Sequence, residues 1–375
     1  MIKIVHFIHA LNMGGAETIV RNYALLLNKT KFDVTVLCLN HDDSPYEKSL
    51  IEAGVKVIVI RDLLKWGYKK GLVFRILNHF MLFWKIKQQL HILKPNIIHV
   101  HLSLNRYIKN ALLPKSVKIF YTHHNNVERW KKEQPDDIDD LAWIIKNYDT
   151  QLIALNKEMQ KELNELFGIN NTKIINNGIN LDLYKNGYNR NNKRAELGIP
   201  NNAFLIVHVG RFNSIKNHDF LIDVFNEVKK VKENAFLLMI GRGSTEKIVR
   251  DKLSFLGLSQ AAMILNDRTD VAEILMSADA SIFPSINEGL GIAVIEMQAA
   301  GLPCVASKGV PIDTKISNKI IYLSLNETSK KWATELLSLI NSKEKISYYN
   351  LRNWDIKKNV QELENLYEEA MLKNE

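Results

Sequence analysis

The chain of 375 residues contains only two cysteines, Cys38 and Cys304. Both fall in apolar, strand-like runs, where an unpaired cysteine behaves as a small buried hydrophobic residue. So few thiols exclude a disulfide framework, and their positions do not indicate a metal site. The cysteine content is therefore typical of a protein from a reducing cytoplasm.

Long hydrophobic runs are missing as well. The strongest apolar concentration, residues 72–84, is interrupted by Arg75, Asn78 and His79. It is too short and too polar to cross a bilayer. The chain starts Met1-Ile2-Lys3 and passes directly into a strand pattern, without the basic and apolar regions of a signal peptide. We expect a cytoplasmic protein, with the inner face of the plasma membrane as one place where it acts.

Two ligand-binding motifs are also missing. The dinucleotide fingerprint G-x-G-x-x-G does not occur, and no Asp-x-Asp motif stands in a loop suited to hold a metal ion. The acidic pairs at 42–43, 136–137 and 139–140 lie in polar surroundings and are interpreted as solvated surface. The sequence therefore offers no obvious metal-binding loop.

The net charge is +9, which implies an anionic partner such as a nucleotide, a nucleic acid or a lipid headgroup. A nucleic-acid-binding protein would cluster its basic residues on one face among exposed aromatic side chains. Here the basic residues are dispersed and no binding motif stands out. No nucleic acid is expected as a partner, although charge alone does not choose among the anions.

Short apolar runs alternate with helical or loop stretches along the whole chain. This alternation predicts an α/β protein with parallel sheets and helices on both faces. The expected strands are residues 2–8, 34–39, 55–60, 97–101, 117–122, 150–155 and 173–179, then 204–209, 235–240, 262–265, 280–283, 303–306 and 319–323.

A stretch rich in asparagine and basic residues, 184–193, separates the two series of strands. We therefore predict two domains, residues 1–182 and 183–354. A final polar helix, residues 355–375, carries Val360, Leu363, Leu366 and Tyr367 at helical spacing.

The most informative stretch is residues 283–307, which reads as strand, loop, helix and strand. The helix is predicted to start near Gly291 or Ile292 and to stop at Gly301, with Pro303 beyond it. The loop before it consists of Asn287, Glu288, Gly289, Leu290 and Gly291. Its glycines permit a tight fold, and the helix N-terminus supplies free N–H groups for an anion.

Two carboxylates flank this loop and helix, Glu288 and Glu296, with seven residues between them. A carboxylate is a poor neighbour for phosphate but a strong acceptor for sugar hydroxyls. Amide groups for phosphate beside carboxylates for diols suit a nucleotide-sugar. The alternative is a surface glutamate before an ordinary helix and a second one on its exposed face.

Arg211 and Lys216 lie in the loop after the strand at 204–209, at the edge where open α/β sheets bind ligands. Together they would neutralise a diphosphate. The alternative is two solvated basic residues in a basic chain.

Two further candidates lie in the first half of the chain. Gly14-Gly15 follows the first strand and permits close approach to a ligand, although many such pairs mark only a turn. His123 and His124 end the strand at 117–122 and could touch a sugar hydroxyl. Which of them points inward is left open, as is a purely structural role for both. His99 and His101 are interpreted as structural.

The Glu-x7-Glu stretch, the Gly-Arg-x4-Lys spacing and the Gly-Gly-Ala-Glu loop together resemble the retaining glycosyltransferases of family 4. The resemblance extends over essentially the whole chain. It implies the GT-B fold, two Rossmann-like doubly wound domains facing across a cleft, with the terminal helix crossing back to the first domain. The enzymes need no metal ion and no cofactor, because protein cations and a helix N-terminus stabilise the leaving group.

The resemblance also implies roles for the candidate residues. Donor-sugar hydroxyls are assigned to Glu288, the ribose diol to Glu296, and the diphosphate to Arg211 and Lys216. Gly14 and Gly15 face the donor phosphate or the acceptor. In this family a histidine at the end of the strand contacts the donor sugar, and His123 is favoured.

The second half departs from the family pattern at three places: Arg242 between Gly241 and Gly243, Asp267 in place of a commoner glycine, and residues 310–316 in place of a Gly-Gly-x-x-Glu segment. The last variant resembles the branch that builds bacterial capsule and exopolysaccharide repeat units. This implies a hexose or N-acetylhexosamine donor, expected to be a UDP-sugar, and a polyprenyl-diphosphate-linked saccharide acceptor. A sugar-nucleotide epimerase of similar two-domain fold is the alternative.

Residues 64–94 mix aromatic and basic side chains, among them Trp66, Phe80, Trp84 and Lys69. Such a helix can lie in a membrane interface, and a lipid-linked acceptor would give it a purpose. The sequence equally permits a core helix with solvated lysines. A peripheral, anionic membrane surface is therefore a predicted partner.

Overall fold

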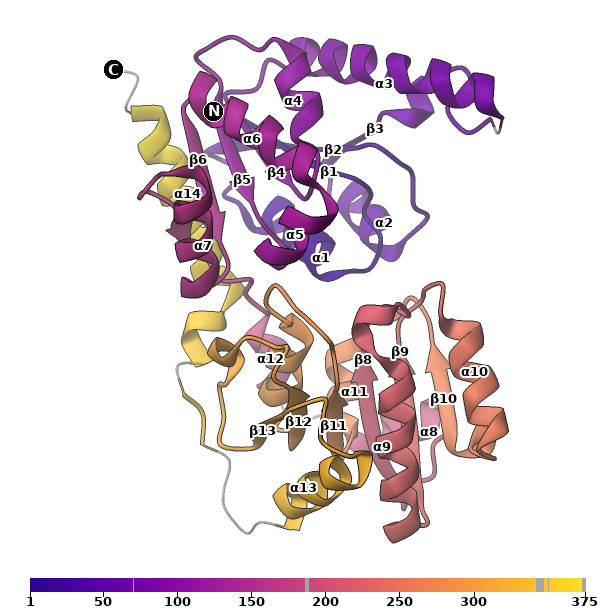
Figure 1. The fold of residues 1–375 in the computed structure, drawn as a ribbon. Helices are drawn as coiled ribbons and strands as arrows, with labels where there is room; N and C mark the ends of the chain where they lie inside the picture. The colour runs from indigo at the N-terminus through magenta and orange to yellow at the C-terminus, as the bar shows by residue number, and fades with distance from the viewer. Residues whose placement is uncertain (70, 186–188, 342–346, 350, 373–375) are drawn as a thin grey trace. The chain divides into compact units, whose positions relative to one another are not determined.

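The computed structural model describes residues 1–69, 71–185, 189–341, 347–349 and 351–372. Internal contacts divide the chain into two units, shown in Figure 1. The first comprises Met1–Asn177 together with Lys357–Glu375, and the second comprises Gly178–Ile356. The second unit therefore begins before the asparagine-rich stretch at 184–193.

The first unit is built on a seven-stranded parallel sheet of order β3-β2-β1-β4-β5-β6-β7. Its strands are β1 (Ile2–Ile8), β2 (Phe32–Cys38), β3 (Lys56–Val59), β4 (Ile97–His101), β5 (Lys118–Thr122), β6 (Thr150–Ala154) and β7 (Lys173–Ile174). Its helices are α1 (Gly15–Leu26), α2 (Pro45–Glu52), α3 (Leu72–Leu93), α4 (Asn105–Ala111), α5 (Val127–Glu133), α6 (Pro135–Asn147), α7 (Lys157–Phe167) and α14 (Ile356–Leu372), with a 3-10 turn, η1 (Arg61–Leu63).

The second unit has a six-stranded parallel sheet of order β10-β9-β8-β11-β12-β13. Its strands are β8 (Phe204–Val209), β9 (Ala235–Ile240), β10 (Ala262–Leu265), β11 (Ala280–Phe283), β12 (Cys304–Ser307) and β13 (Ile320–Leu323). Its helices are α8 (Arg190–Glu196), α9 (His218–Val231), α10 (Glu246–Phe255), α11 (Val271–Ser277), α12 (Ile292–Ala299) and α13 (Ser329–Asn341). The 3-10 turns are η2 (Leu181–Tyr184), η3 (Ser214–Lys216), η4 (Ser259–Ala261), η5 (Ile312–Thr314) and η6 (Leu351–Trp354).

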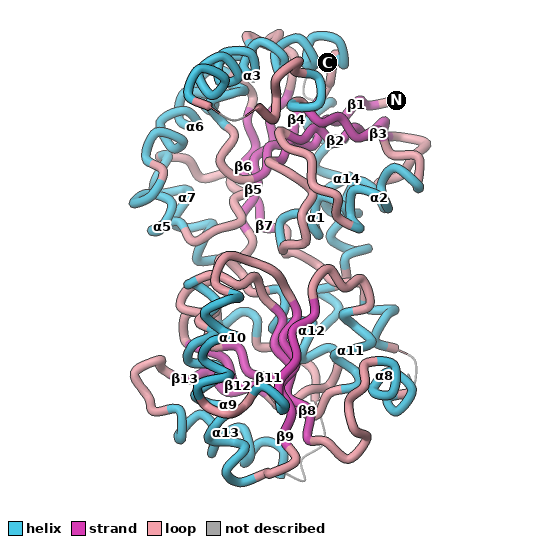
Figure 2. Tube along the Cα trace, turned by 90° about the vertical axis from the view of Figure 1, so that its right-hand side faces the viewer, coloured by secondary structure: helices cyan, strands magenta, loops and turns pink. Residues whose placement is uncertain are grey.

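Each sheet carries helices on both faces, as Figure 2 shows. Strand β8 is apolar except for His208, because both faces of the sheet are covered. Phe204 and Ile206 belong to one buried cluster, whereas Leu205 and Val207 belong to the cluster on the opposite face. Successive side chains of a strand point to opposite faces, so a parallel strand covered on both sides needs a continuous apolar run.

The predicted alternation is confirmed, and the predicted ranges of β1, β4, β8, β9, β10 and β11 match the structure. The prediction of a strand over 173–179 is wrong, because only Lys173 and Ile174 pair with β6. Their partners are Ile153 and Ala154, the last two residues of β6. Because β6 ends there, the residues after Ile174 have no further β6 residues beside them with which to continue the pairing.

The C-terminal helix α14 belongs to the first unit although it follows the second along the chain. Its buried residues Leu363 and Tyr367 pack into that unit. The Glu364 carboxylate accepts a hydrogen bond from the Asn28 N–H at 2.6 Å, and Glu368 pairs with Lys31 at 2.6 Å.

Both sheets have a topological switch point, where the strand order reverses. In the first unit it lies between β1 and β4, and in the second between β8 and β11. Open α/β sheets bind ligands beyond the carboxyl ends of the strands at such points. Candidate residues close to these two positions are therefore the ones expected to contact a ligand.

Candidate active site

The loop after β11 and the helix that follows it form one side of the switch point in the second unit. Gly291 caps α12 with φ of 81°, a left-handed conformation that favours glycine. A Cβ atom there would also lie 3.1 Å from Val310 Cγ1. The predicted helix start at Gly291 or Ile292 is confirmed, and its first N–H groups face the loop side of the sheet.

The structure brings Lys216 and Glu288 together from the two sides of the switch point. Lys216 Nζ lies 2.6 Å from Glu288 Oε1, and the two side chains are 18% and 13% exposed. The Ser285 hydroxyl also donates to Glu288 Oε1. The carboxylate is thereby held in one orientation by a cation and a hydroxyl group.

Backbone contacts lock the two loops against each other. The Ile286 N–H donates to the Ile215 carbonyl at 2.7 Å, and the Lys216 N–H donates to the Asn213 side chain at 3.1 Å. Lys216 Nζ lies 4.8 Å from the centre of the Phe283 ring. Because η3 is anchored in this way, Lys216 is directed toward Glu288.

Sequence reasoning missed Ser285 and Gly309. Gly309 accepts the Glu288 N–H at 2.9 Å, and a Cβ atom on it would lie only 2.1 Å from the Ile286 carbonyl oxygen. Only glycine fits at that position. The sequence signal that could have identified Ser285 is its place just after a strand and three residues before Glu288.

Arg211 follows Gly210 at the end of β8, on the same loop as Lys216, and is exposed. Gly289 and Leu290 lie between Glu288 and the cap of α12, and Leu290 is buried. The second unit thus carries Arg211, Lys216, Glu288 and the α12 N-terminus at the carboxyl ends of β8 and β11.

Glu296 lies within α12 and is partly exposed. Burial of its carboxyl group raises its pKa to about 7. Tyr184 of η2 lies close enough for the Glu296 charge to contribute to raising the pKa of its hydroxyl. Glu296 is therefore a carboxylate kept in surroundings that disfavour its charge.

The raised pKa of Glu296 makes the free energy of unfolding depend on pH. Because the folded pKa of Glu296 exceeds its ordinary value of 4.5, its contribution favours folding at pH below 4.5 and is lost as pH rises through 7. We expect Glu296→Gln to raise the free energy of unfolding at pH 8 by up to about 3 kcal/mol, since each pKa unit corresponds to about 1.4 kcal/mol.

Urea unfolding at pH 5 and pH 8 measures this effect. The exposed Glu233→Gln variant serves as the control and is expected to change little at either pH. A Glu296→Gln variant no more stable than the parent at pH 8 would show that burial does not penalise the charge.

The first unit carries the remaining candidates. Gly14 is the N-cap of α1 in an extended conformation, and Gly15 is its first residue. Both therefore follow β1 at the switch point of that sheet. His123 is buried, with its Nδ1 3.2 Å from the Tyr121 hydroxyl and its ring on Trp130 at 4.4 Å.

Both histidines present an unused nitrogen. His123 Nε2 and His124 Nδ1 are buried and have no hydrogen-bond partner among the described residues. His124 Nε2 is already bonded to His101. The choice of His123 over His124 therefore stays a prediction.

Two of the departures from the family pattern lie together in the structure. Arg242 follows β9 and Asp267 follows β10, and Arg242 Nε lies 3.5 Å from Asp267 Oδ1. Asp267 adopts φ of 52°, a conformation that the commoner glycine adopts without strain. The two replacements therefore form a charge pair at one edge of the site.

Comparison with known proteins agrees with this architecture. The model of glycosyltransferase family 4 matches residues 13–183, and the model of glycosyl transferases group 1 matches residues 189–353. The fold is that of the GT-B glycosyltransferases. The chain belongs to family 4 of these enzymes, which favours a transferase over the epimerase alternative.

Two curated relatives cover most of the chain. One is the capsular polysaccharide biosynthesis glycosyltransferase CapH of Staphylococcus aureus, 24% identical over 374 residues, covering 98% of this chain and 99% of CapH. The other is the UDP-Gal:alpha-D-GlcNAc-diphosphoundecaprenol alpha-1,3-galactosyltransferase of Escherichia coli, 24% identical over 321 residues, covering 82% and 79% of the two chains.

A solved structure has the same fold. Anabaena Alr3699/HepE in complex with UDP and glucose superimposes with a TM-score of 0.73 at 18% identity, covering 98% of this chain and 95% of that one.

Proposed function

We propose that this glycosyltransferase retains the anomeric configuration and moves a hexose or N-acetylhexosamine from a UDP-sugar to a lipid-linked saccharide in capsule or exopolysaccharide synthesis. The observation that carries the proposal is the Lys216–Glu288 pair beside the N-terminus of α12, at the switch point of the second sheet. It offers a cation for phosphate next to a carboxylate for sugar hydroxyls.

The names of the similar proteins support the finer parts of the proposal. CapH concerns capsular polysaccharide, and the Escherichia coli relative is named for a UDP-galactose donor and a diphosphoundecaprenol acceptor. HepE was crystallised with UDP and glucose.

Each candidate residue has a role in this reaction. Lys216 and Arg211 bind the diphosphate and stabilise the charge that develops on it. Glu288 holds the sugar hydroxyls, and Glu296 the ribose diol. Gly14 and Gly15 let the backbone approach the donor phosphate or the acceptor, and His123 contacts the donor sugar.

The chemistry follows a front-face route. The bond between the anomeric carbon and the phosphate oxygen breaks, a bond from the same carbon to the acceptor oxygen forms on the same face, and the acceptor proton passes to the leaving phosphate oxygen. No protein nucleophile is then required. Protein cations and N–H groups at a helix N-terminus supply the stabilisation that a metal ion would otherwise give.

A donor screen tests the proposal. The purified chain is incubated with the common nucleoside-diphosphate sugars, and release of nucleoside diphosphate is followed by chromatography. A UDP-sugar is expected to give the fastest release, and Arg211→Ala is expected to slow it. Absence of release from every donor, with and without saccharide acceptors, would contradict the proposal.

The metal-free expectation gives a separate prediction. We expect activity to survive EDTA with little loss, because Lys216 and Arg211 neutralise the leaving diphosphate. Initial rates before and after chelation, followed by added Mg²⁺ or Mn²⁺, measure this. A strict metal requirement restored by either ion would mean that the protein cations are not sufficient.

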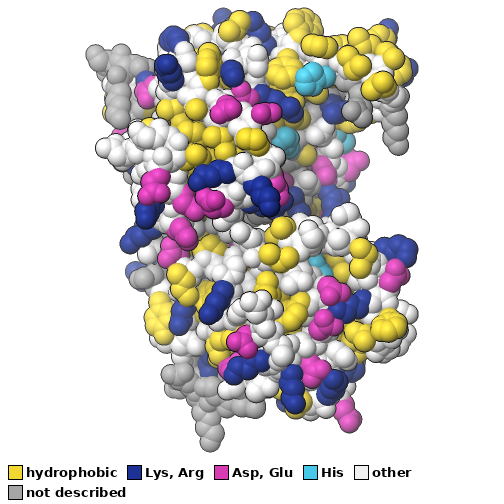
Figure 3. Space-filling model, in the orientation of Figure 1, with side chains coloured by type: hydrophobic (Ala, Val, Ile, Leu, Met, Phe, Trp, Pro, Cys, Tyr) yellow, Lys and Arg dark blue, Asp and Glu magenta, His cyan; other side chains and the backbone are white. Residues whose placement is uncertain are grey.

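We further propose that α3 places the enzyme on an anionic membrane. Six large apolar side chains between residues 72 and 84 of this helix are exposed: Leu72, Val73, Ile76, Leu77, Phe80 and Trp84. Figure 3 shows hydrophobic side chains gathered over α3. No described helix is long and apolar enough to cross a bilayer.

Basic side chains accompany this apolar face. Lys69 lies 5.4 Å from the Phe74 ring and Lys85 5.1 Å from the Trp84 ring, and Lys70 lies outside the described residues. No acidic residue occurs between Asp62 and Glu128. An apolar face with a basic border matches an interface of anionic lipid headgroups.

Liposome sedimentation tests the docking. Phe80 is 69% exposed, and we expect Phe80→Ser and the Lys69→Glu/Lys85→Glu double variant to weaken binding to anionic liposomes. Binding of the parent should fall as salt rises, because the screening length shortens to about 10 Å at 0.1 M. The control is Phe255→Ser, which removes an aromatic side chain that is 87% exposed on α10. Equal binding to neutral and anionic liposomes would contradict an electrostatic contribution.

A further inference from the structure

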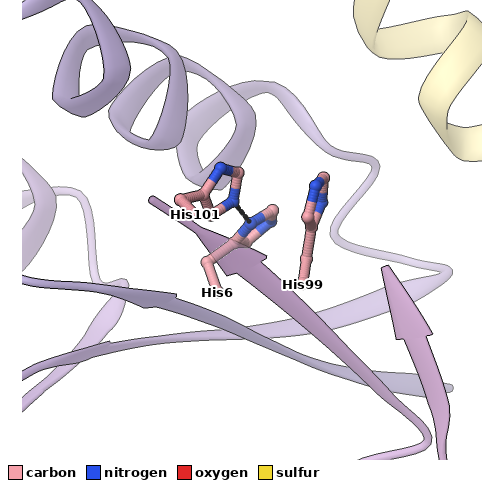
Figure 4. Close-up of side chains that lie close together, drawn as sticks. All are labelled: His6, His99 and His101. Atoms are coloured by element: carbon pink, nitrogen blue, oxygen red, sulfur yellow. Dashed lines mark hydrogen bonds between the residues drawn. The ribbon is translucent and has the colours of Figure 1, made fainter. Parts of the chain in front are cut away.

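Four histidines follow one face of the first sheet. His6 of β1 is the register partner of His99 in β4, and His101 stands two residues further along the same strand. Since side chains alternate between faces, these three share a face, as Figure 4 shows. All three are fully buried. His124, just after β5, continues the row.

Three of these imidazoles form a hydrogen-bonded chain. His6 Nδ1 lies 3.0 Å from His101 Nε2, and His101 Nδ1 lies 3.0 Å from His124 Nε2. A neutral imidazole has one N–H donor and one acceptor nitrogen. His101 therefore donates to one neighbour and accepts from the other, and the whole chain has a direction.

The imidazoles are neutral near pH 7. Burial lowers the pKa of His6 and of His124 to about 3, and lowers the pKa of His101 well below its ordinary value. Tyr23 and Tyr367, which pack against this face, are also neutral because burial raises the pKa of each hydroxyl. A neutral chain has only two possible directions.

The ends of the chain decide between the two directions. His6 Nε2 lies deep in the sheet and has no partner among the described residues. Within the described part of the chain, either direction leaves one terminal N–H group unpaired, on His6 Nε2 or on His124 Nδ1. Because His6 is fully buried whereas His124 is partly exposed, the unpaired N–H group costs less on His124. His6 therefore carries its proton on Nδ1 and donates to His101, which in turn donates to His124 Nε2.

A metal ion is the competing explanation, because one nitrogen from each of His6, His99 and His101 lies within 4.8 Å of the others. The geometry is unfavourable for zinc. Tetrahedral bonds of about 2.0–2.1 Å separate ligand nitrogens by about 3.3 Å and splay the rings, whereas His99 and His101 stack at 4.2 Å. Both nitrogens of His99 are also engaged, by the Tyr367 hydroxyl at 2.5 Å and Thr122 Oγ1 at 2.7 Å.

We propose that His6 and His101 are positioning residues that hold His124 with its proton on Nδ1, so that His124 donates a hydrogen bond to an oxygen of the sugar substrate. The inference rests on the proposed function. With Nε2 occupied as an acceptor and Nδ1 protonated, neutral His124 has no free lone pair. It cannot act as a general base, which agrees with the proposed transfer of the acceptor proton to the leaving phosphate oxygen.

Nuclear magnetic resonance of the full chain with 15N-labelled histidine tests the tautomer directly. The expected spectrum shows His124 with a protonated Nδ1, which is not the form that free histidine prefers. In His101→Phe, which keeps a ring against His99 but removes both hydrogen bonds, His124 should revert to the Nε2-protonated form. His101→Gln offers one acceptor and one donor in the same place and should restore the Nδ1 form.

Kinetics supply a second readout that a merely structural role would not move. We expect His101→Phe and His124→Phe each to lower kcat/KM for the sugar donor by about tenfold, the usual scale for one hydrogen bond. The double variant should lose no more than either single one, because both remove the same contact. His101→Gln should recover most of the loss, and affinity for free UDP should stay unchanged in all four.

The outcomes separate this inference from the proposed function. The expected tautomers in a chain that releases nucleotide from no donor would support the histidine chain and refute the function. An Nε2-protonated His124 in the parent, or a tautomer unaffected by His101→Phe, would overturn the inference. Stoichiometric zinc in the purified chain that is lost in His6→Gln would overturn it in favour of a metal site.

Discussion

Replacing Lys216 by alanine is expected to lower kcat/KM for the nucleotide-sugar donor by one to two orders of magnitude. Lys216 supplies a charge-assisted contact to the diphosphate, and such contacts contribute about 1.5–3 kcal/mol each. The leaving group gains charge as its bond breaks, so part of this stabilisation belongs to the transition state and kcat falls with kcat/KM. Arg211→Ala should behave in the same way.

The structure adds a second cost to the Lys216 variant. Lys216 is also the partner of Glu288, at 2.6 Å, and both side chains are largely buried. Removing one member of such a pair leaves the other charge uncompensated. Lys216→Ala should therefore be the more damaging of the two, whereas Arg211→Ala removes a cation from an exposed position.

Initial rates over a range of donor concentrations measure both variants. Lys247→Ala is the matched control, because Lys247 is 85% exposed and pairs along α10 with Asp251. Unchanged kcat/KM in both Arg211→Ala and Lys216→Ala would contradict the assignment of these two residues to the diphosphate.

The second large effect separates the two glutamates. The sugar ring gains positive character as its bond to phosphate breaks, and a nearby carboxylate stabilises that change more than the ground state. Glu288→Gln should therefore lower kcat strongly and leave affinity for free UDP almost unaltered. The amide oxygen still accepts a hydrogen bond from Ser285, so the geometry of the loop is largely kept. The amide no longer balances the charge of Lys216.

Glu296→Gln is expected to weaken nucleotide binding more than it lowers kcat. The ribose diol is present in the donor and in the nucleotide product alike, so its contact changes little during the reaction. Binding of donor and of free UDP should weaken, with a smaller effect on kcat. Because the pKa of Glu296 is raised to about 7, UDP affinity of the parent should increase as pH rises through 7, and the variant should lose that increase.

Calorimetry with UDP between pH 6 and pH 8, beside initial rates with the donor, measures both variants. The roles would be reversed if Glu288→Gln lost UDP affinity and Glu296→Gln lost only turnover.

The elements that could be predicted from the sequence are those specified locally. Strand β8 is apolar except for His208 because both its faces are covered, and the start of α12 is marked by Gly291. The carboxyl ends of β8 and β11 are expected at one edge of a sheet. The sequence therefore predicts that Lys216 and Glu288 belong to the same site.

The remainder depends on contacts between residues far apart in the chain. The approach of Gly309 to the Ile286 carbonyl, and the pairing of Arg242 with Asp267, depend on how the loops after neighbouring strands meet. The hydrophobic periodicity of the sequence does not predict such contacts. The sequence indicates a structural role for His99 and His101, and it does not show that β1 aligns His6 with His99.

The stereochemistry of transfer tests the central claim most directly. The chain is incubated with an α-linked UDP-sugar and a saccharide acceptor, and the configuration at the new bond is read from the proton spectrum while the reaction proceeds. A retaining transferase gives an α-linked product together with UDP, and the Glu288→Gln variant is expected to lose both. A β-linked product would contradict retention, because a single inversion requires a base on the opposite face of the sugar.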